Sequence, residues 1–191
     1  MVILSAPSGC GKTTLLDRLL KRHSDWIGSI SVTTRPPRLG EKKGKDYQFV
    51  TLREFQSLKK RRQFLEWAKV FGSYYGTLKK VVEEGAEKGR TVVLTVDIQG
   101  ARSIRRALKR RIPIFSIFVL PPSIRALRER LEKRSTDRPE EIEKRIQRAQ
   151  EEIKVAKEYD VTVINRDLDQ TVHEMEELIT GFERKLQKRR K

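Results

Sequence analysis

The chain has 191 residues, of which 37% are hydrophobic and 36% are charged, and its formal net charge is +17. This length is enough for one domain with a hydrophobic core, and the positive charge favours anionic partners such as nucleotides or nucleic acids. The single cysteine excludes an internal disulfide and a cysteine-rich metal site, and no apolar run is long enough to cross a bilayer.

The first expected strand, residues 2–5, leads into a loop of small residues and then into a helix. The segment reads VILSAPSGCGKTT from residue 2 to residue 14. It matches the phosphate-binding motif G-x-x-x-x-G-K-[ST], except that Ala6 stands at the first glycine. Backbone N–H groups of such a loop, together with a helix N-terminus, surround an anion. We therefore expect ATP or GTP to bind this segment.

Two side chains of the loop have expected chemical roles. Lys12 reaches the β- and γ-phosphates, and the Thr13 hydroxyl is a ligand for Mg²⁺ bound with ATP. Cys10 allows two interpretations: a small residue tolerated at a variable loop position, or a thiol whose pKa is lowered by Lys12 and the helix N-terminus. The residues expected to contact ATP here are Ala6, Pro7, Ser8, Gly9, Cys10, Gly11, Lys12, Thr13 and Thr14.

The rest of the chain alternates between apolar runs and helical patterns. Residues 92–96, 114–120 and 161–164 are rich in β-branched residues and are expected to form, with residues 2–5, buried parallel strands flanked by helices. Apolar residues spaced three or four apart predict a last helix over residues 168–186. The fold class is therefore α/β.

Two segments depart from this alternation. Residues 29–80 contain short alternating stretches and one helix, whose expected start is the capping-box pattern from Thr51 to Glu54. Residues 123–148 are dense in arginine and glutamate and poor in apolar residues, so we expect a solvated helical flap. Because the first strand begins at residue 2, we expect no signal peptide and a cytoplasmic protein without a membrane partner.

A series of further motifs resembles the guanylate kinases, enzymes that phosphorylate GMP with ATP, and the resemblance covers nearly the whole chain. The motifs are SVTTRPPRLGE (31–41), GKDYQF (44–49), FLEWA (64–68), YYGT (74–77), DIQGA (97–101), PPS (121–123), the pair Arg130 and Arg134, Arg145, and NRDL (165–168).

The resemblance implies a P-loop NTPase core with a parallel sheet flanked by helices, an inserted mixed α+β GMP-binding region and a helical lid. The corresponding boundaries are residues 1–28, 86–122 and 149–191 for the core, 29–85 for the GMP-binding region and 123–148 for the lid. The two segments that depart from the alternating pattern thus correspond to the GMP-binding region and the lid.

The resemblance also implies which residues bind GMP. The residues expected to hold its phosphate are Ser31, Arg35, Arg38, Tyr47 and Tyr75, and those expected to face the guanine are Glu66, Thr77 and Asp97. The chemistry agrees, because arginines bind a phosphate with several donors at once, and Pro36-Pro37 would hold Arg35 and Arg38 stiffly apart. A carboxylate at Glu66 would accept from guanine N1–H and N2–H₂ side by side, whereas adenine presents an acceptor at N1.

The implied reaction is ATP + GMP ⇌ ADP + GDP, with dGMP as a further expected acceptor. An oxygen of the GMP phosphate is the nucleophile and is already anionic, so positioning and charge neutralisation are the requirements. The expected catalytic residues are Lys12, Arg35, Arg130, Arg134 and Arg145, the last three closing from the lid. Asn165 is expected near the adenine by the resemblance alone.

One position departs from the family pattern. Thr95 stands two residues before Asp97, where the family usually has an acidic residue. Two alternatives stay open: a guanylate-kinase-like interaction module that has lost catalysis, although such modules typically lack a working phosphate loop, and a related sugar-phosphate kinase. The charge of +17 predicts at most weak, salt-dependent nucleic-acid binding. The oligomeric state is not determined by the sequence.

Overall fold

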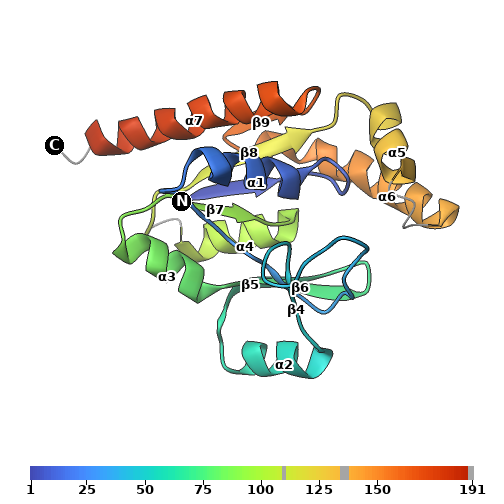
Figure 1. Cartoon of the computed structure of the whole chain (residues 1–191), viewed down its shortest axis with the longest axis horizontal. Coiled ribbons are helices and arrows are strands. Elements are labelled where there is room, and N and C mark those ends of the chain that lie inside the picture. Colours follow the sequence, from blue (N-terminus) through green and yellow to red (C-terminus); the bar gives the residue numbers. More distant parts are fainter. Residues whose placement is uncertain (109–110, 134–137, 189–191) are drawn as a thin grey trace. The chain divides into compact units, whose positions relative to one another are not determined.

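The computed structural model describes residues 1–108, 111–133 and 138–188 (Figure 1). Its contacts divide the chain into two compact units. The terminal unit comprises Val2–Arg22 and Phe115–Lys191, and the central unit comprises His23–Ile114 together with Met1. The region boundaries given above stay a prediction. No helix in the described ranges is both long and apolar enough to cross a membrane.

The terminal unit contains three parallel strands, in the order β1, β8, β9. All four residues of β1 are buried, and Ile3 and Val163 lie on strands paired to either side of β8. Three of the four expected strands are thereby found here. The elements of this unit are β1 (Val2–Ser5), α1 (Lys12–Arg22), β8 (Phe115–Leu120), α5 (Ile124–Lys133), α6 (Pro139–Lys154), the 3₁₀ turn η1 (Ala156–Glu158), β9 (Val161–Ile164) and α7 (Leu168–Lys188).

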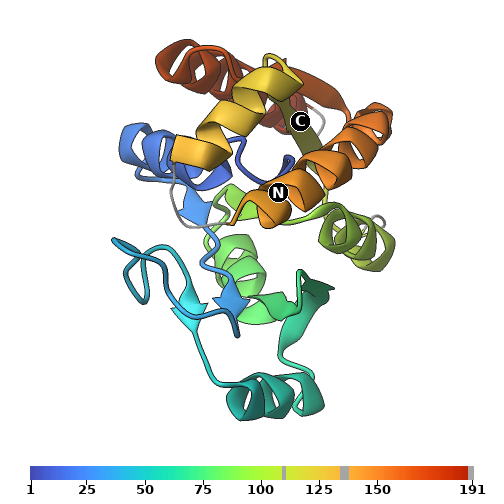
Figure 2. The same ribbon diagram turned by 90° about the vertical axis from the view of Figure 1, so that its right-hand side faces the viewer.

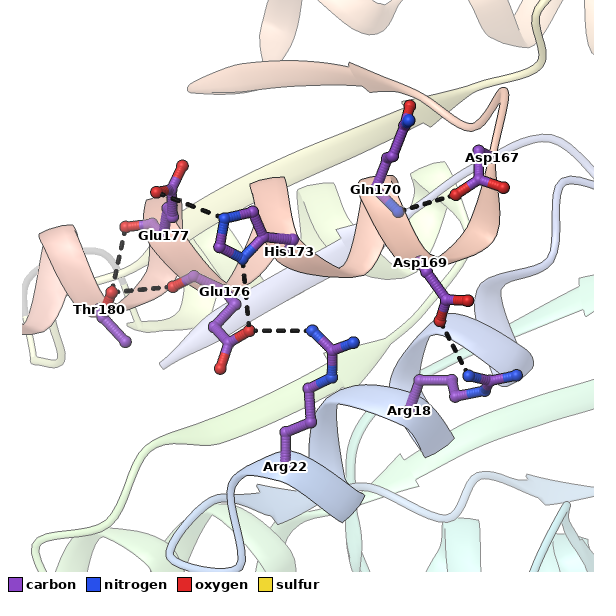
Figure 3. A network of polar contacts seen from close by, with 9 residues as sticks. All are labelled: Arg18, Arg22, Asp167, Asp169, Gln170, His173, Glu176, Glu177 and Thr180. Atoms are coloured by element: carbon purple, nitrogen blue, oxygen red, sulfur yellow. Dashed lines mark hydrogen bonds and ion pairs between the residues drawn. The ribbon is translucent and has the colours of Figure 1, made fainter.

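Helix α7 packs against α1 with both apolar and charged side chains. Its buried residues include Val172, Met175 and Ile179, which repeat at three- and four-residue steps as the sequence predicted. On the exposed side, Arg18 donates to Asp169 at 2.9 Å and Arg22 to Glu176 at 3.2 Å (Figure 3). Exposed ion pairs of this kind contribute little individually, so apolar burial is the main source of the α1–α7 contact.

The helices α5 and α6 differ from the solvated flap expected for residues 123–148. The two helices, yellow and orange in Figure 2, contact each other. They bury apolar residues, among them Leu127, Leu131 and Ile146. Helix α6 also continues to Lys154. The few apolar residues of this segment are spaced so that they share one face of each helix, and composition alone does not reveal this.

The central unit contains a short parallel pair, β2 and β7, and a four-stranded mixed sheet in the order β4, β3, β6, β5. Strand β3 is parallel to β4, while β6 is antiparallel to both β3 and β5. The elements are β2 (Ile27–Gly28), β3 (Val32–Thr33), β4 (Gln48–Phe49), α2 (Leu52–Lys60), β5 (Phe64–Val70), β6 (Ser73–Leu78), α3 (Lys79–Glu87), β7 (Val92–Thr95) and α4 (Ile98–Leu108).

Helix α2 begins as the sequence predicted. Thr51 is its N-cap, and Glu54 closes the capping box, with the Thr51 N–H donating to the Glu54 carboxylate at 2.6 Å. The helix buries Phe55 against Phe64 of β5, with ring centroids 4.5 Å apart. Helix α2 therefore packs against one face of the mixed sheet. A register shift between Phe64 and Glu66 interrupts the regular alternation of side chains along β5.

Candidate active site

The phosphate-binding loop of the terminal unit connects β1 to α1. Gly9 has φ +94° and Gly11 has φ +86°, values at which side chains with a Cβ are strained. A Cβ on Gly9 would also lie 2.9 Å from Cδ2 of Leu131 on α5. These glycines allow the tight loop expected from the motif, and Ala6, at the position of the first glycine, is buried without a positive φ.

Lys12 is the first residue of α1, and its side chain folds back over the loop. Its Nζ donates to the carbonyl oxygens of Ala6 at 2.5 Å and Pro7 at 3.5 Å. The ammonium is thus held beside the loop, while Thr13 is half-buried and Thr14 is exposed. The expected nucleotide-binding residues of this loop are contiguous around the N-terminus of α1, where the helix dipole favours an anion.

Cys10 is fully buried in the loop. Burial raises the pKa of its thiol to about 11, and the nearby charges of Lys12 and Arg130 offset only part of that effect. The interpretation of Cys10 as an activated thiol is therefore wrong, because it counted the neighbouring positive charge and not the loss of solvent. The alternative, a small residue that fills the loop, agrees with the structure.

Two of the three expected lid arginines contact groups of the terminal unit. Arg145 on α6 donates from Nη1 to the hydroxyl of Ser8 at 2.8 Å, and only 9% of Arg145 is exposed. Arg130 on α5 donates from Nη2 to the main-chain oxygen of Asn165 at 2.9 Å. Both helices thus carry a guanidinium close to the phosphate-binding loop or its support. Arg134 lies outside the described residues.

Asn165 follows β9 and is hydrogen-bonded to the phosphate-binding loop. Its side chain is 5% exposed, and Nδ2 donates to the main-chain oxygen of Cys10 at 2.9 Å. Its Oδ1 accepts from the Thr171 hydroxyl at 3.3 Å, and a Cβ on Gly11 would lie 3.1 Å from Nδ2. The side chain expected to approach adenine is thus engaged with the loop backbone, and this contact joins residues 155 positions apart.

In the central unit, Arg35 lies among aromatic rings and one carboxylate. Its Cζ is 5.3 Å from the centroid of the Tyr47 ring, and Tyr47 meets the Tyr75 ring edge-on at 6.0 Å. Its Nη2 donates to Oε1 of Glu41 at 2.8 Å. Burial raises the pKa of Tyr47, so its hydroxyl keeps the proton and stays a donor. Three of the expected phosphate-binding residues are thus gathered at one place.

The remaining two expected phosphate-binding residues belong to the same unit. Ser31 is buried just before β3, and its main-chain oxygen accepts from the Gln48 N–H at 2.9 Å. The backbone N–H of Arg38 donates to Oε2 of Glu41 at 2.7 Å, and the Arg38 side chain is partly exposed. Glu41 therefore links both arginine positions of the loop.

The expected guanine-binding residues form a second cluster in the central unit. Glu66 of β5 and Thr77 of β6 are cross-strand partners, and the Thr77 hydroxyl donates to Oε1 of Glu66 at 2.7 Å. Desolvation by burial raises the pKa of Glu66 to about 7, partly offset by the Thr77 hydrogen bond, and the charge of Asp97 adds to the rise. Glu66 and Asp97 are thus close enough for their charges to interact.

Gly100, at the start of α4, lies between these carboxylates. Its N–H donates to Oδ1 of Asp97 at 2.8 Å, and a Cβ placed on it would lie 2.7 Å from Oε2 of Glu66. A side chain at position 100 would have to displace the Glu66 carboxylate. Gly100 and Glu41 are both within the motifs of the sequence analysis, which gave neither a role. The approach of Gly100 to Glu66 depends on the folding of separate segments. Glu41 contacts Arg35 and Arg38 within its own loop, six and three residues away, so an acid just after the Arg-Pro-Pro-Arg segment was a signal available in the sequence.

The described residues contain no group of three His, Cys, Asp or Glu side chains that could hold a metal ion. Mg²⁺ in nucleotide sites is typically held by substrate phosphates, waters and one or two protein oxygens, so a single hydroxyl such as that of Thr13 fits this kind of site. Thr95, which replaces the usual acid of the family, is the half-buried last residue of β7.

Comparison with known proteins identifies relatives of this chain. The guanylate kinase family model matches residues 1–181. Guanylate kinase from Wolbachia sp. subsp. Brugia malayi is 44% identical over 179 residues, 94% of this chain and 91% of the relative. Guanylate kinase from Rickettsia prowazekii is 46% identical over 181 residues, 95% of this chain and 90% of the relative.

A solved structure shows the same likeness in three dimensions. The crystal structure of guanylate kinase from Anaplasma phagocytophilum superposes with a TM-score of 0.76 at 32% identity, covering 95% of this chain and 84% of that one. An α/β fold with a parallel sheet, flanking helices and a second mixed sheet is common to the sequence expectation and the structure. The chain belongs to the guanylate kinase family.

Proposed function

We propose that the chain transfers the γ-phosphoryl group of ATP to GMP, with the terminal unit binding ATP and the central unit binding GMP. The observation that carries this assignment is the buried carboxylate of Glu66, held by the Thr77 hydroxyl at 2.7 Å. A buried carboxylate is costly unless a partner supplies hydrogen bonds. Guanine supplies two adjacent donors, N1–H and N2–H₂, and so provides that partner.

Glu66 also accounts for selection against adenine. Adenine presents an acceptor at N1, which would face the carboxylate and leave it without donors. A site built around buried polar groups rejects such an analogue by roughly 10⁴-fold. We assign Thr77 on β6 and Asp97 after β7 to the same guanine site as Glu66. Gly100 has no side chain and leaves room for the Glu66 carboxylate.

The phosphate of GMP is assigned to the cluster around Arg35. A phosphate dianion requires several donors, which Arg35, Arg38 and the two tyrosine hydroxyls supply. Tyr47 is suited to this role because burial raises the pKa of its hydroxyl. We assign Ser31 to the same phosphate because it lies buried just before β3, the strand that leads to Arg35.

ATP is assigned to the loop between β1 and α1. Its β- and γ-phosphates would draw Lys12 away from the carbonyl oxygens of Ala6 and Pro7, which hold it at 2.5 and 3.5 Å. Arg130 on α5 and Arg145 on α6 donate to Asn165 and Ser8, and we assign them to neutralise charge near the loop. Mg²⁺ bound with ATP would be held by the Thr13 hydroxyl and would neutralise phosphate charge.

The proposed phosphoryl transfer requires no covalent bond between the protein and either substrate. The GMP phosphate is already a nucleophile, so no general base is needed, and the side chains act by orienting both phosphates and neutralising their charge. Lys12 and the lid arginines do so for the donor, while Arg35 and Arg38 do so for the acceptor.

The test is coupled ADP release with ATP and Mg²⁺ and with GMP, AMP, CMP, UMP, a phosphorylated sugar or no acceptor. We expect turnover with GMP and not with the other acceptors, and loss of this preference in Glu66→Gln. The matched control is Glu83→Gln, which changes an exposed glutamate of α3. Turnover with a phosphorylated sugar and none with GMP would overturn the assignment, as would nucleotide binding without turnover of any acceptor.

A further inference from the structure

The loop Arg35-Pro36-Pro37-Arg38 is closed by one carboxylate. Glu41 accepts from Nη2 of Arg35 at 2.8 Å with Oε1 and from the backbone N–H of Arg38 at 2.7 Å with Oε2. The Glu41 N–H in turn donates to the Arg38 carbonyl at 3.0 Å. The Arg35 and Glu41 side chains are only 14% and 19% exposed. This pair is thus shielded from solvent, unlike the ion pairs on the surface of α7.

We infer that Glu41 is a positioning residue that holds Arg35 in the orientation needed to bind the phosphate of GMP. This inference rests on the proposed phosphate site. Glu41 acts through Arg35 and through the loop backbone at Arg38, and does not itself contact the substrate. Because the Glu41 carboxylate would repel a phosphate, it does not act by binding GMP directly. It acts by orienting Arg35 and the loop at Arg38 before the phosphate binds.

The geometry around Arg35 supports this role. Glu41 holds Nη2, and the Pro36 carbonyl accepts from Nη1 at 2.7 Å. The Tyr47 ring lies 5.3 Å from Cζ. Contacts on two nitrogens and near one face fix the plane of the guanidinium, while a guanidinium has five N–H donors in total. Donors therefore remain for a phosphate, in a plane that is set in advance.

The charge on Glu41 is part of the arrangement. Desolvation would raise the pKa of its carboxyl, but hydrogen bonds from Arg35 and from the Arg38 backbone outweigh that effect and hold the pKa below its usual value. Glu41 therefore stays ionised at neutral pH. It offsets the repulsion between two guanidinium groups that a rigid Pro-Pro segment holds in one short loop.

Substituting glutamine for Glu41 removes the charge of the side chain and keeps its size, so the two effects can be distinguished. Glu41→Gln keeps the volume of the side chain but has one carbonyl oxygen, so it can accept from Arg35 or from the Arg38 N–H and not from both in the present geometry. Without the charge-assisted bond, Arg35 is free to adopt other orientations, and part of the phosphate affinity is used to restore the productive one.

The experiment compares the affinities of GMP and guanosine, measured by calorimetry, in the wild type and in Glu41→Gln, Arg35→Ala and the double variant. Guanosine has the base and no phosphate, so it reports on the proposed guanine site of Glu66, Thr77 and Asp97 and not on the phosphate site. We expect Glu41→Gln to weaken GMP binding roughly ten-fold with guanosine affinity unchanged, and to have little further effect when Arg35 is already alanine. Glu83→Gln is the matched control.

The outcomes separate this inference from the assignment on which it rests. If Arg35→Ala leaves the ratio of GMP to guanosine affinity unchanged, the proposed phosphate site is wrong. If Arg35→Ala lowers this ratio and Glu41→Gln does not, only the role of Glu41 is overturned. Equal losses for GMP and guanosine, with a lower melting temperature, would assign Glu41 to folding stability and would also overturn the inference.

Discussion

The hydroxyl of Thr77 donates a 2.7 Å hydrogen bond to the carboxylate of Glu66, its cross-strand partner, and both side chains are buried. This contact orients the carboxylate. It also supplies one of the hydrogen bonds that a buried carboxylate requires. Base recognition in the central unit therefore begins from a side chain whose direction is already set.

Removing this hydroxyl should weaken GMP binding. In Thr77→Ala, Glu66 loses a hydrogen bond, and a hydrogen bond to a charged group contributes about 1.5–3 kcal/mol. We therefore expect the KM for GMP to rise ten-fold or more and the KM for ATP to change little. Steady-state kinetics with each substrate varied in turn measures this. Thr77→Ser keeps the hydroxyl and should retain most of the affinity; equal defects in both variants would contradict the explanation.

The pH dependence of guanosine binding should report on Glu66. Burial raises its pKa to about 7 in the ligand-free protein, and guanine requires the ionised form. We therefore expect guanosine to bind more tightly as pH rises through about 7 and the pH dependence to disappear in Glu66→Gln. Guanosine is the suitable ligand because the phosphate of GMP titrates in the same range.

Glu66 should also make folding stability depend on pH. Guanosine binding is expected to strengthen as pH rises, whereas the contribution of Glu66 to folding stability is expected to fall. Because its folded pKa of about 7 exceeds the ordinary value of 4.5, protonated Glu66 stabilises the ligand-free fold. This contribution is present below pH 4.5 and is lost as pH rises through 7. Urea unfolding across this range should show the wild type losing stability relative to Glu66→Gln; parallel curves would mean that Glu66 does not titrate there.

Cys10 should be unreactive in the folded protein. Its side chain is fully buried, and burial raises the thiol pKa to about 11, so little thiolate is present near neutral pH. We expect iodoacetamide to label Cys10 slowly in the native protein and completely in denaturant, and ATP to make little difference. Mass spectrometry of timed samples measures this, and rapid native labelling that ATP suppresses would contradict it.

The backbone conformation and close packing at Gly9 should make glycine necessary there for a stable phosphate-binding loop. Alanine there meets φ +94° and a Cβ only 2.9 Å from Leu131, so we expect Gly9→Ala to lower the free energy of unfolding and to weaken ATP binding. The positive φ alone costs roughly 1–2 kcal/mol.

Gly181 in α7 is the matched control for this change. Nothing lies within 4 Å of a Cβ placed on it, so Gly181→Ala should raise the free energy of unfolding by about 0.5–1 kcal/mol without affecting ATP. Urea titration and calorimetry distinguish the two. A stabilised Gly9→Ala with normal ATP affinity would show that the loop does not need this backbone conformation.

Local patterns were enough to predict much of the fold and of the candidate site. Strands β1 and β9 have the predicted bounds, and the capping box at Thr51 starts α2. These features are encoded in a few adjacent residues, by β-branched content or by hydrogen bonds within one helical turn. The same is true of the phosphate-binding loop, whose glycines have the positive φ values that its tight turn requires.

The tertiary structure decided the burial, pKa and hydrogen-bond partners of the candidate site residues. Cys10 lies two residues before Lys12 in the sequence, but only the packing of the loop removes solvent from Cys10 and raises its pKa. The bond from Asn165 to the Cys10 carbonyl spans 155 positions, and the pKa of Glu66 depends on burial beside Asp97. Residue identity determines which chemistry is available, whereas desolvation and long-range hydrogen bonds, which exist only after folding, determine each group's charge and orientation.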